Sequence, residues 1–363
     1  MLALLSTPVL AASASAPLVS VLSPITAGVN TPVMLAEDGA GNFYLTDPRS
    51  GGVLKYNNSG LHSATFTIAR PQGIAVTDSG DMIISQGNAA LVLNSAGQEK
   101  FKLGKGAGQF KMANGITVDT AGFVYVVDSL DNCVQVFNSS GAAVNSSKAA
   151  AGKPANSFGS GGSANGQLAM PSGIAFEKTS GQLAVADTNN GRIQFFDTAG
   201  VWKRTIGSTG VGELSFSTPV AVAFEYTTAS PPALSRMYVT DSFQSSVQVI
   251  DPAANPVWLG SIGSYGMTNG KLLTPGAALF DSIGGRLLVA NGFGNITVYG
   301  ITNAVPQTAG DCDGNGAVSI AEVQSAINMF LGINPVAVCV DMDDSKGVTI
   351  AEVQKVINGF LGL

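Results

Sequence analysis

Acidic, amide and hydroxyl side chains near the C-terminus recur at a spacing that suits an oxygen-ligand site. Residues 311–322 read Asp-Cys-Asp-Gly-Asn-Gly-Ala-Val-Ser-Ile-Ala-Glu. Positions 1, 3, 5, 7, 9 and 12 offer side-chain or carbonyl oxygens, and Gly316 at position 6 allows a sharp turn. A hard dication needs roughly six to eight oxygens around one centre. The segment therefore predicts a calcium site with ligands Asp311, Asp313, Asn315, Ala317, Ser319 and Glu322.

The same pattern repeats thirty residues later. Lys346 stands where the first loop has glycine, and Ser345 is a weaker ligand than the asparagine of the first loop. A side chain at a position that favours positive φ costs about 1 kcal/mol. We therefore expect a second, weaker Ca²⁺ site, with ligands Asp341, Asp343, Ser345, Gly347, Thr349 and Glu352.

Each loop runs into an apolar segment that begins Ala-Glu-Val-Gln and ends Phe-Leu-Gly, which predicts a helix leaving the loop. Pro306 and Pro335 lie in the segments before the loops, where no helical period is present. Paired EF-hand-like loops with only exiting helices resemble dockerin modules, and the resemblance covers residues 311–363. It implies calcium binding and a cohesin-like protein partner. Dockerins typically carry Ser-Thr and Asp at positions 10 to 12, where this chain has Ile-Ala-Glu.

Two interpretations of this C-terminal region remain open. Calcium could serve only to fold a tail too small to be stable alone, or the folded tail could dock a partner. Cys312 lies in the first loop and Cys339 just before the second. In an oxidising compartment a disulfide between them would tie the loops together, whereas free thiols are the alternative. Cys133, on a predicted strand, is expected to be buried and unreactive.

An internal repeat that spans residues 31–300 precedes this region. The recurring pattern is Pro-x-Gly-Ile-Ala-Val, a turn, an apolar strand that ends in Asp, a polar turn, and Val-Gln-Val-Phe. The first, second and sixth copies match it less well but keep the register. Six copies recur at intervals of 39 to 57 residues, with anchors at Pro32, Pro71, Asn114, Pro171, Pro219 and Pro275. One four-stranded blade per copy predicts an all-β propeller with six blades. Residues 18–25 are predicted to supply a strand that closes the ring.

Gly-rich connectors such as residues 104–110 separate the copies, and with the repeat they resemble the NHL family. That resemblance implies a six-bladed propeller over residues 17–300, and it is far more specific for fold than for function. A linker at 301–310 then leads to the small α-helical, dockerin-like domain at 311–363.

The aspartate that ends the second strand of several blades has a structural and a functional interpretation. We favour the structural one, in which the carboxylate accepts backbone N–H groups of the next turn. His62 is the single histidine of the chain. A single histidine cannot build a multi-histidine metal site, and one beside Leu61 in a predicted turn does not make a convincing Ser-His-Asp triad, so no catalytic residue and no other cofactor is predicted.

The N-terminus and the charge distribution bear on location and partners. Residues 2–10 are mostly apolar and Ala12-Ser13-Ala14 fits a cleavage site, so residues 1–14 are predicted to be a signal peptide rather than a frayed mature terminus. No segment is long enough to span a membrane. Residues 303–363 carry seven acids and two bases of a chain whose net charge is −6, which argues against nucleic acid as a partner.

These observations together predict a secreted or cell-envelope protein that is not an enzyme. The face of its propeller would bind a protein or a polysaccharide, and its calcium module would dock or tether it. One alternative is a propeller hydrolase or lyase carried by the same module, and another is a purely structural component of a surface layer or matrix.

Overall fold

The computed structural model describes residues 15–106, 108–227, 230–303, 310, 312, 317–337, 339–341 and 347–361. By its contacts the chain divides into two compact units, Met1–Thr302 and Asn303–Leu363. The predicted signal peptide at 1–14 lies outside the described residues.

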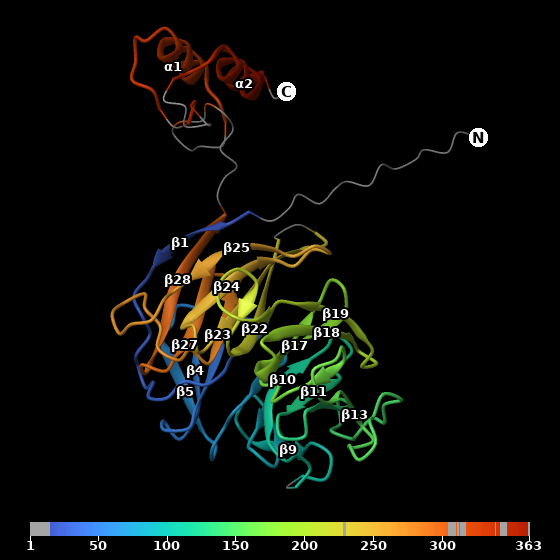
Figure 1. Cartoon of the computed structure of the whole chain (residues 1–363). Coiled ribbons are helices and arrows are strands. Elements are labelled where there is room, and N and C mark those ends of the chain that lie inside the picture. The colour runs from blue at the N-terminus through green and yellow to red at the C-terminus, as the bar shows by residue number, and fades with distance from the viewer. Residues whose placement is uncertain are drawn as a thin grey trace, which may run out of the picture. The chain divides into compact units, whose positions relative to one another are not determined.

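The first unit contains six four-stranded antiparallel sheets, the blades (Figure 1), whose first strands line a central channel. Blade 1 contains β2 (Leu35–Glu37), β3 (Phe43–Asp47), β4 (Gly52–Tyr56) and β5 (His62–Thr67). Blade 2 contains β6 (Ile74–Val76), β7 (Met82–Ser85), β8 (Ala90–Leu93) and β9 (Glu99–Lys102). Blade 3 contains β10 (Ala113–Val118), β11 (Val124–Asp128), β12 (Cys133–Phe137) and β13 (Ser157–Phe158).

The later blades have the same layout with longer strands. Blade 4 contains β16 (Ile174–Glu177), β17 (Gln182–Asp187), β18 (Arg192–Asp197) and β19 (Trp202–Ile206), with a 3₁₀ turn at Thr188–Asn190. Blade 5 contains β22 (Pro219–Tyr226), β23 (Leu234–Asp241), β24 (Ser246–Asp251) and β25 (Val257–Ile262). Short parallel pairs lie in two connectors, β14 (Ser160–Gly161) with β15 (Gln167–Leu168) and β20 (Ser208–Thr209) with β21 (Ser215–Phe216).

Blade 6 takes its outermost strand from the opposite end of the unit. Its sheet order is β1-β28-β27-β26, in which β1 (Pro17–Val21) precedes all other strands in the sequence. The other three strands are β26 (Ala277–Asp281), β27 (Arg286–Asn291) and β28 (Asn295–Asn303). The Leu22 amide continues the pairing by donating to the Val298 carbonyl at 2.9 Å. The predicted closing strand is therefore confirmed, and the unit is a six-bladed β-propeller.

The core of the propeller is divided among six interfaces between neighbouring blades. Each of six hydrophobic clusters draws its buried residues mainly from two adjacent blades, and one joins blade 6 to blade 1. Strands in the middle of a blade are therefore covered on both faces, as in β11, where all five residues are buried. This is why their sequences are apolar at successive positions instead of alternating.

The glycine of the repeated Pro-x-Gly segment has a packing role. A Cβ built on Gly73 would lie 2.0 Å from the Asn114 carbonyl oxygen of the next blade, and one on Gly173 would lie 2.4 Å from the Val220 oxygen. The innermost strands approach so closely here that only a glycine fits without displacing the backbone.

The second unit contains two helices, α1 (Ile320–Phe330) and α2 (Ile350–Leu361). They pack through a small core that includes Ala326, Met329 and Val356. The helix predicted after each loop is thus present. No described helix is long and apolar enough to cross a membrane.

Candidate functional site

The innermost strand of each blade lines the central channel. Side chains alternate along a strand, so residues two apart point to the same side. One position faces the channel in every blade and forms an apolar neck, made of Leu35, Ile74, Ile116, Ile174, Val222 and Ala278.

Two residues further along each strand the channel opens into a cavity of about 770 Å³. Five of the six side chains at this level are apolar and the sixth is a carboxylate. We call this set the middle ring: Glu37, Val76, Val118, Phe176, Phe224 and Phe280. All six are half-buried, which is expected for walls of an open cavity.

Two residues beyond the middle ring along each inner strand, the cavity ends in a polar rim. The rim residues are Asp78, Thr120, Lys178, Tyr226 and Ser282. Lys178 and Asp78 are exposed, while the Tyr226 hydroxyl accepts a hydrogen bond from the Lys178 amide at 2.9 Å. The cavity therefore has an apolar floor, largely aromatic and aliphatic walls, and a charged entrance.

Glu37 is the one ionisable member of the middle ring. No hydrogen bond or ion pair joins its carboxylate to another residue in the described part of the chain. Burial, together with the nearby carboxylates of Asp281 and Asp38, raises the pKa of Glu37 from 4.5 to about 7. Lys178 and Arg286 act in the opposite direction.

The two neighbouring acids have partners of their own. Asp281 accepts the Arg286 Nε–H at 2.9 Å and two backbone amides of its turn. Asp38 accepts the Tyr44 hydroxyl at 3.0 Å, and the Lys55 ammonium lies 3.8 Å away. Hydrogen bonds from Asn42 and other donors hold the pKa of Asp38 below its usual range, although burial opposes them.

The aspartates that end the second strands are structural, as predicted. The Asp47 carboxylate accepts the Asn30, Thr31, Arg49 and Ser50 amides at 2.7 to 3.1 Å. Equivalent bonds hold Asp128, Asp187 and Asp241. Each carboxylate is fully buried and ties its turn to the segment that enters the blade.

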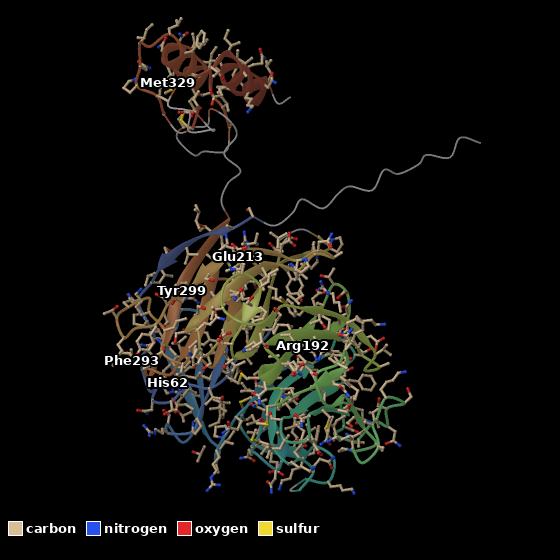
Figure 2. The ribbon with its side chains drawn as sticks, in the orientation of Figure 1. His62, Arg192, Glu213, Phe293, Tyr299 and Met329 are labelled. Carbon is tan, nitrogen blue, oxygen red and sulfur yellow. A yellow bond between two sulfur atoms is a disulfide. The ribbon has the colours of Figure 1, made fainter. Side chains whose placement is uncertain are left out.

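The lone histidine lies away from the cavity. His62 is exposed on β5, the outermost strand of blade 1, where its Nε2 lies 3.0 Å from the Thr65 hydroxyl (Figure 2). The free Cys133 is buried, and burial raises the pKa of its thiol to about 12. This agrees with the expectation that it is unreactive.

The predicted calcium ligands divide into two groups. Asp311, Asp313, Asn315, Asp343 and Ser345 lie outside the described residues. The other predicted ligands are described: Ala317, Ser319, Glu322, Asp341, Gly347, Thr349 and Glu352.

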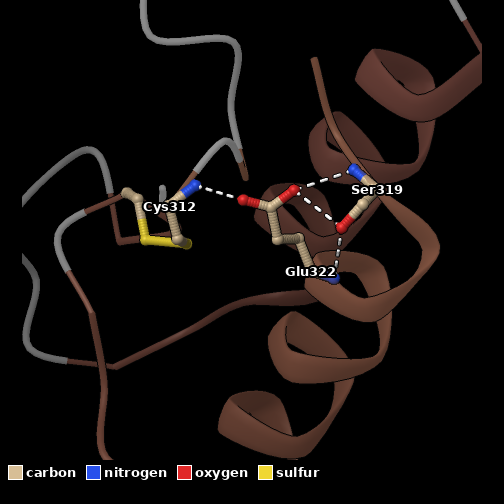
Figure 3. Close-up of a disulfide and its surroundings, with 4 residues drawn as sticks. Cys312, Ser319 and Glu322 are labelled. Atoms are coloured by element: carbon tan, nitrogen blue, oxygen red, sulfur yellow. Dashed lines mark hydrogen bonds between the residues drawn. A yellow bond between two sulfur atoms is a disulfide. The ribbon is translucent and has the colours of Figure 1, made fainter. Parts of the chain in front are cut away.

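Glu322 turns its carboxylate back toward the start of its own loop (Figure 3). One oxygen accepts the Cys312 amide at 2.7 Å, and the other accepts the Ser319 amide at 2.8 Å and hydroxyl at 2.9 Å. Ser319 in turn accepts the Glu322 amide at 3.3 Å, which completes a capping box at the start of α1. Glu352 and Thr349 repeat this arrangement at α2.

These carboxylates fit an oxygen-ligand site in two respects. Glu322, Glu352 and Asp341 are all buried, and buried carboxylates in a small unit require compensation by donors or cations. The hydrogen bonds of Glu322 also bring Cys312, Ser319 and Glu322, at positions 2, 9 and 12 of the first loop, to one place. In the described part of the chain, no group of three or more His, Cys, Asp or Glu side chains is placed to hold a metal. The calcium sites therefore stay a prediction.

The predicted disulfide is present. Cys312 and Cys339 are bonded, and the bridge joins the beginning of the first loop to the segment before the second (Figure 3). Together with α1 and α2, it holds the two halves of the unit against each other.

Comparisons with known proteins agree with the propeller. Residues 168–196 match the family model of the NHL repeat, as the sequence predicted. No curated protein matches the chain. Among solved structures, a streptogramin B lyase is similar at 12% identity and a TM-score of 0.52, over 79% of this chain and 98% of the lyase.

Two proteins from Bacteroides thetaiotaomicron are similar as well. An auxiliary nutrient binding protein has 12% identity and a TM-score of 0.56, over 76% of this chain and 70% of its own. A protein of unknown function has 14% identity and a TM-score of 0.55, over 79% and 73%. At this level of identity the likeness concerns the fold alone, and proteins with different activities share it.

Sequence reasoning singled out the loops and missed Glu37. A signal was present, because Glu37 occupies the register position that Val76, Val118, Phe176 and the other inner strands fill with apolar residues. Aligning the six inner strands by the anchor positions of the repeat would have exposed it. The alignment is weak because the glycine position holds Met34 in blade 1, Ala221 in blade 5 and Ala277 in blade 6.

Proposed function

We propose that the chain is an exported binding protein without catalytic activity. The propeller takes a ligand of small-molecule size in the cavity at the middle ring, either free or as the end of a polysaccharide or protein chain. The C-terminal unit is a calcium-stabilised module that docks or tethers the propeller.

The cavity is the observation that supports the binding role. Its volume of about 770 Å³ falls within the range of roughly 300–1,000 Å³ of small-molecule sites, which combine mostly apolar walls with a few polar groups. Backbones of six different blades hold its walls, so the site is preformed. The nutrient binding protein of similar fold is consistent with such a role.

The C-terminal unit supports docking through side chains that its own core leaves exposed. Ile320 and Ile350, at equivalent positions of the two loops, are 73% and 72% exposed. Phe330 with Leu331, and Phe360 with Leu361, are exposed at the ends of the two helices. Large apolar surface on so small a unit favours a protein partner. Calcium, held by the twelve predicted ligands, would supply the charge that lets the acidic loops fold.

Ligand binding at the cavity can be tested by comparing two tryptophan variants. A library of metabolites and oligosaccharide fragments is screened against the full chain by thermal shift, with calcium present. A ligand at 100 times its Kd stabilises the protein by about 2.7 kcal/mol, which corresponds to a shift of several degrees.

Val118→Trp would fill the cavity from the middle ring. Val211→Trp is the control, because Val211 is 76% exposed on a connector. We expect compounds that stabilise the native chain and Val211→Trp but not Val118→Trp. Compounds that stabilise all three equally would place the binding site elsewhere. A ligand that mass spectrometry shows to be consumed would favour the alternative, a hydrolase or lyase.

A further inference from the structure

We propose that the cavity binds an organic cation, an ammonium group carried on an apolar or aromatic body, with Glu37 as its counter-ion. This inference rests on the proposed binding role and adds the chemical class of the ligand.

The first argument is the asymmetry of the middle ring. The six inner strands are equivalent by register, and in five of them the side chain at this level is Val or Phe. A purely structural ring would be completed by a sixth apolar residue. Placing a half-buried carboxylate among apolar walls costs free energy unless the charge is compensated. Glu37 therefore lowers the stability of the free propeller, which is the pattern expected of a ligand-binding residue.

The second argument is that the protein itself does not compensate this charge. In the described part of the chain Glu37 has no hydrogen-bond donor, and the nearest basic groups are otherwise engaged or lie at the rim. Arg286 binds Asp281 and the Asn58 carbonyl, while Lys178 is exposed at the entrance. A ligand cation would provide the missing partner.

The third argument is the arrangement of the aromatic residues. Phe176, Phe224 and Phe280 belong to three consecutive blades, and blade 6 adjoins blade 1 across a shared hydrophobic cluster. Phe280 therefore belongs to the blade next to that of Glu37, and on its other side its ring stacks on Tyr238 of blade 5, with ring centroids 5.8 Å apart. Aromatic faces attract cations and cover apolar groups, so this arc suits the body of the ligand while Glu37 binds its charge.

Other ligand classes fit the cavity less well. An anionic ligand would meet Glu37 without a facing basic group in the ring. A dication such as Ca²⁺ needs roughly six to eight oxygens, and the middle ring supplies one carboxylate. A monovalent organic cation needs one counter-ion and an apolar surface, and both are present.

The pKa of Glu37, raised to about 7 by burial and neighbouring acids, adds a pH dependence. Below that value the carboxyl group is neutral and loses its attraction for a cation. The charged groups that act on it are Asp281, Asp38, Lys178 and Arg286.

Three fluorescent dyes with one aromatic body and different charges test the proposal. Dansylcadaverine carries an ammonium group, its N-acetyl derivative is neutral, and dansyl-6-aminohexanoate carries a carboxylate. Each is titrated into the full chain with calcium present, at pH 6 and at pH 8. The variants are Glu37→Gln, Glu37→Val, which completes the apolar ring, and the control Glu213→Gln, which removes an exposed carboxylate on the connector at 207–216, outside the cavity lining.

We expect the native protein and Glu213→Gln to bind the ammonium dye about 10-fold more tightly than the neutral dye at pH 8, which corresponds to about 1.4 kcal/mol. Between pH 6 and pH 8 the affinity for the ammonium dye should rise about 10-fold, because an alkylammonium group stays charged while Glu37 loses its proton. Glu37→Gln should abolish both effects, and Glu37→Val should favour the neutral dye.

Two results would overturn the inference. Equal binding of the three dyes by the native protein and Glu37→Gln would show that the cavity binds ligands without selecting cations, and the proposed binding role would stand. Absence of binding by every dye up to millimolar concentration would reject the cation site. The proposed function would then be decided separately by the Val118→Trp comparison.

Discussion

The propeller contains buried charges that are paired within the protein and one half-buried carboxylate, Glu37, that is not. Arg236 and Glu225 of blade 5 are almost fully buried and form an ion pair, with the Arg236 Nη1 atom 2.9 Å from both Glu225 oxygens. The Tyr238 hydroxyl donates to the same carboxylate at 2.6 Å. In blade 5 the carboxylate of Glu225 therefore accepts hydrogen bonds from protein donors. The carboxylate of Glu37, at the cavity wall, has no such donor in the described part of the chain.

Removing one partner of the blade 5 pair should be strongly destabilising. Arg236→Met would leave the Glu225 charge buried, and we expect a loss of about 3–5 kcal/mol in the free energy of unfolding. The double variant Glu225→Gln with Arg236→Met keeps an acceptor for Tyr238 and should recover most of that loss. Urea unfolding of the propeller measures both.

Lys203→Met is the matched control for that prediction. Lys203 pairs with Asp197 at 2.7 Å in an exposed setting, and such pairs contribute about 0–1 kcal/mol. A loss in Lys203→Met as large as in Arg236→Met would contradict the role assigned to burial.

Glu37 should make the stability of the propeller depend on pH. Its pKa is raised from 4.5 to about 7 in the folded protein, so folding favours the protonated form. The stabilising contribution is complete below pH 4.5 and is lost as the pH rises through 7. We expect Glu37→Gln to unfold at a higher urea concentration than the native chain at pH 8.5 and at nearly the same concentration at pH 4. An equal difference at the two pH values would contradict this linkage.

At the scale of secondary structure, α1 and α2 begin with the same N-terminal capping interaction. Each helix has a hydroxyl residue at its N-cap and a glutamate three positions later, which bond reciprocally. The glutamates are also the last predicted ligands of the calcium loops. One carboxylate can therefore serve the helix in the absence of calcium and the cation in its presence.

Glu322→Gln separates these two roles. Glutamine keeps the capping box, so we expect little change in helicity by circular dichroism in EDTA. The variant loses the charged, bidentate oxygen pair that a calcium loop uses at its last position, so affinity for Ca²⁺ at the first site should fall at least about 10-fold by calorimetry. Glu213→Gln, an exposed change in the propeller, is the control. Unchanged calcium affinity in Glu322→Gln would contradict the predicted ligand set.

At the scale of the whole molecule, the two units are stabilised by different means. The propeller closes its own ring and has six hydrophobic interfaces, while the second unit has one small core and a disulfide. Units of about 60 residues bury a smaller fraction of their surface and depend more on such cross-links.

Reductant and EDTA should therefore act on one unit only. Cys312 and Cys339 close a loop with a sequence separation of 27, and opening it should cost the second unit about 3–4 kcal/mol. The propeller has only the buried free Cys133 among its described residues, so its thermal transition should not move. Differential scanning calorimetry of the full chain, with Cys312→Ser/Cys339→Ser as a variant insensitive to reductant, measures both transitions. A shift of the propeller transition by either reagent would show that the units are not stabilised independently.

Much of this architecture could be derived from local sequence. The Pro-x-Gly and Val-Gln-Val-Phe segments recur at a spacing that allows one blade each, and the count of six follows from the repeats. The strand at 18–25 followed from the need to cover the last edge. The exiting helices were predicted because the two loops are copies of one pattern. The disulfide was predicted because Cys312 lies in the first loop and Cys339 just before the second, in a chain expected to be exported to an oxidising compartment.

The cavity and its single carboxylate depend on tertiary structure. Glu37 is adjacent to Asp38 in the sequence and looks like part of an acidic turn, and only ring closure brings it into the same cavity as Phe280, more than 240 residues away. Burial and the field of Asp281 then change its protonation, and neither is a property of local sequence. The sequence by itself determined the repeats, the blades and the oxygen-rich loops, because these follow from short-range spacing. Only the folded ring decided which side chains share the channel, because that depends on register across six blades.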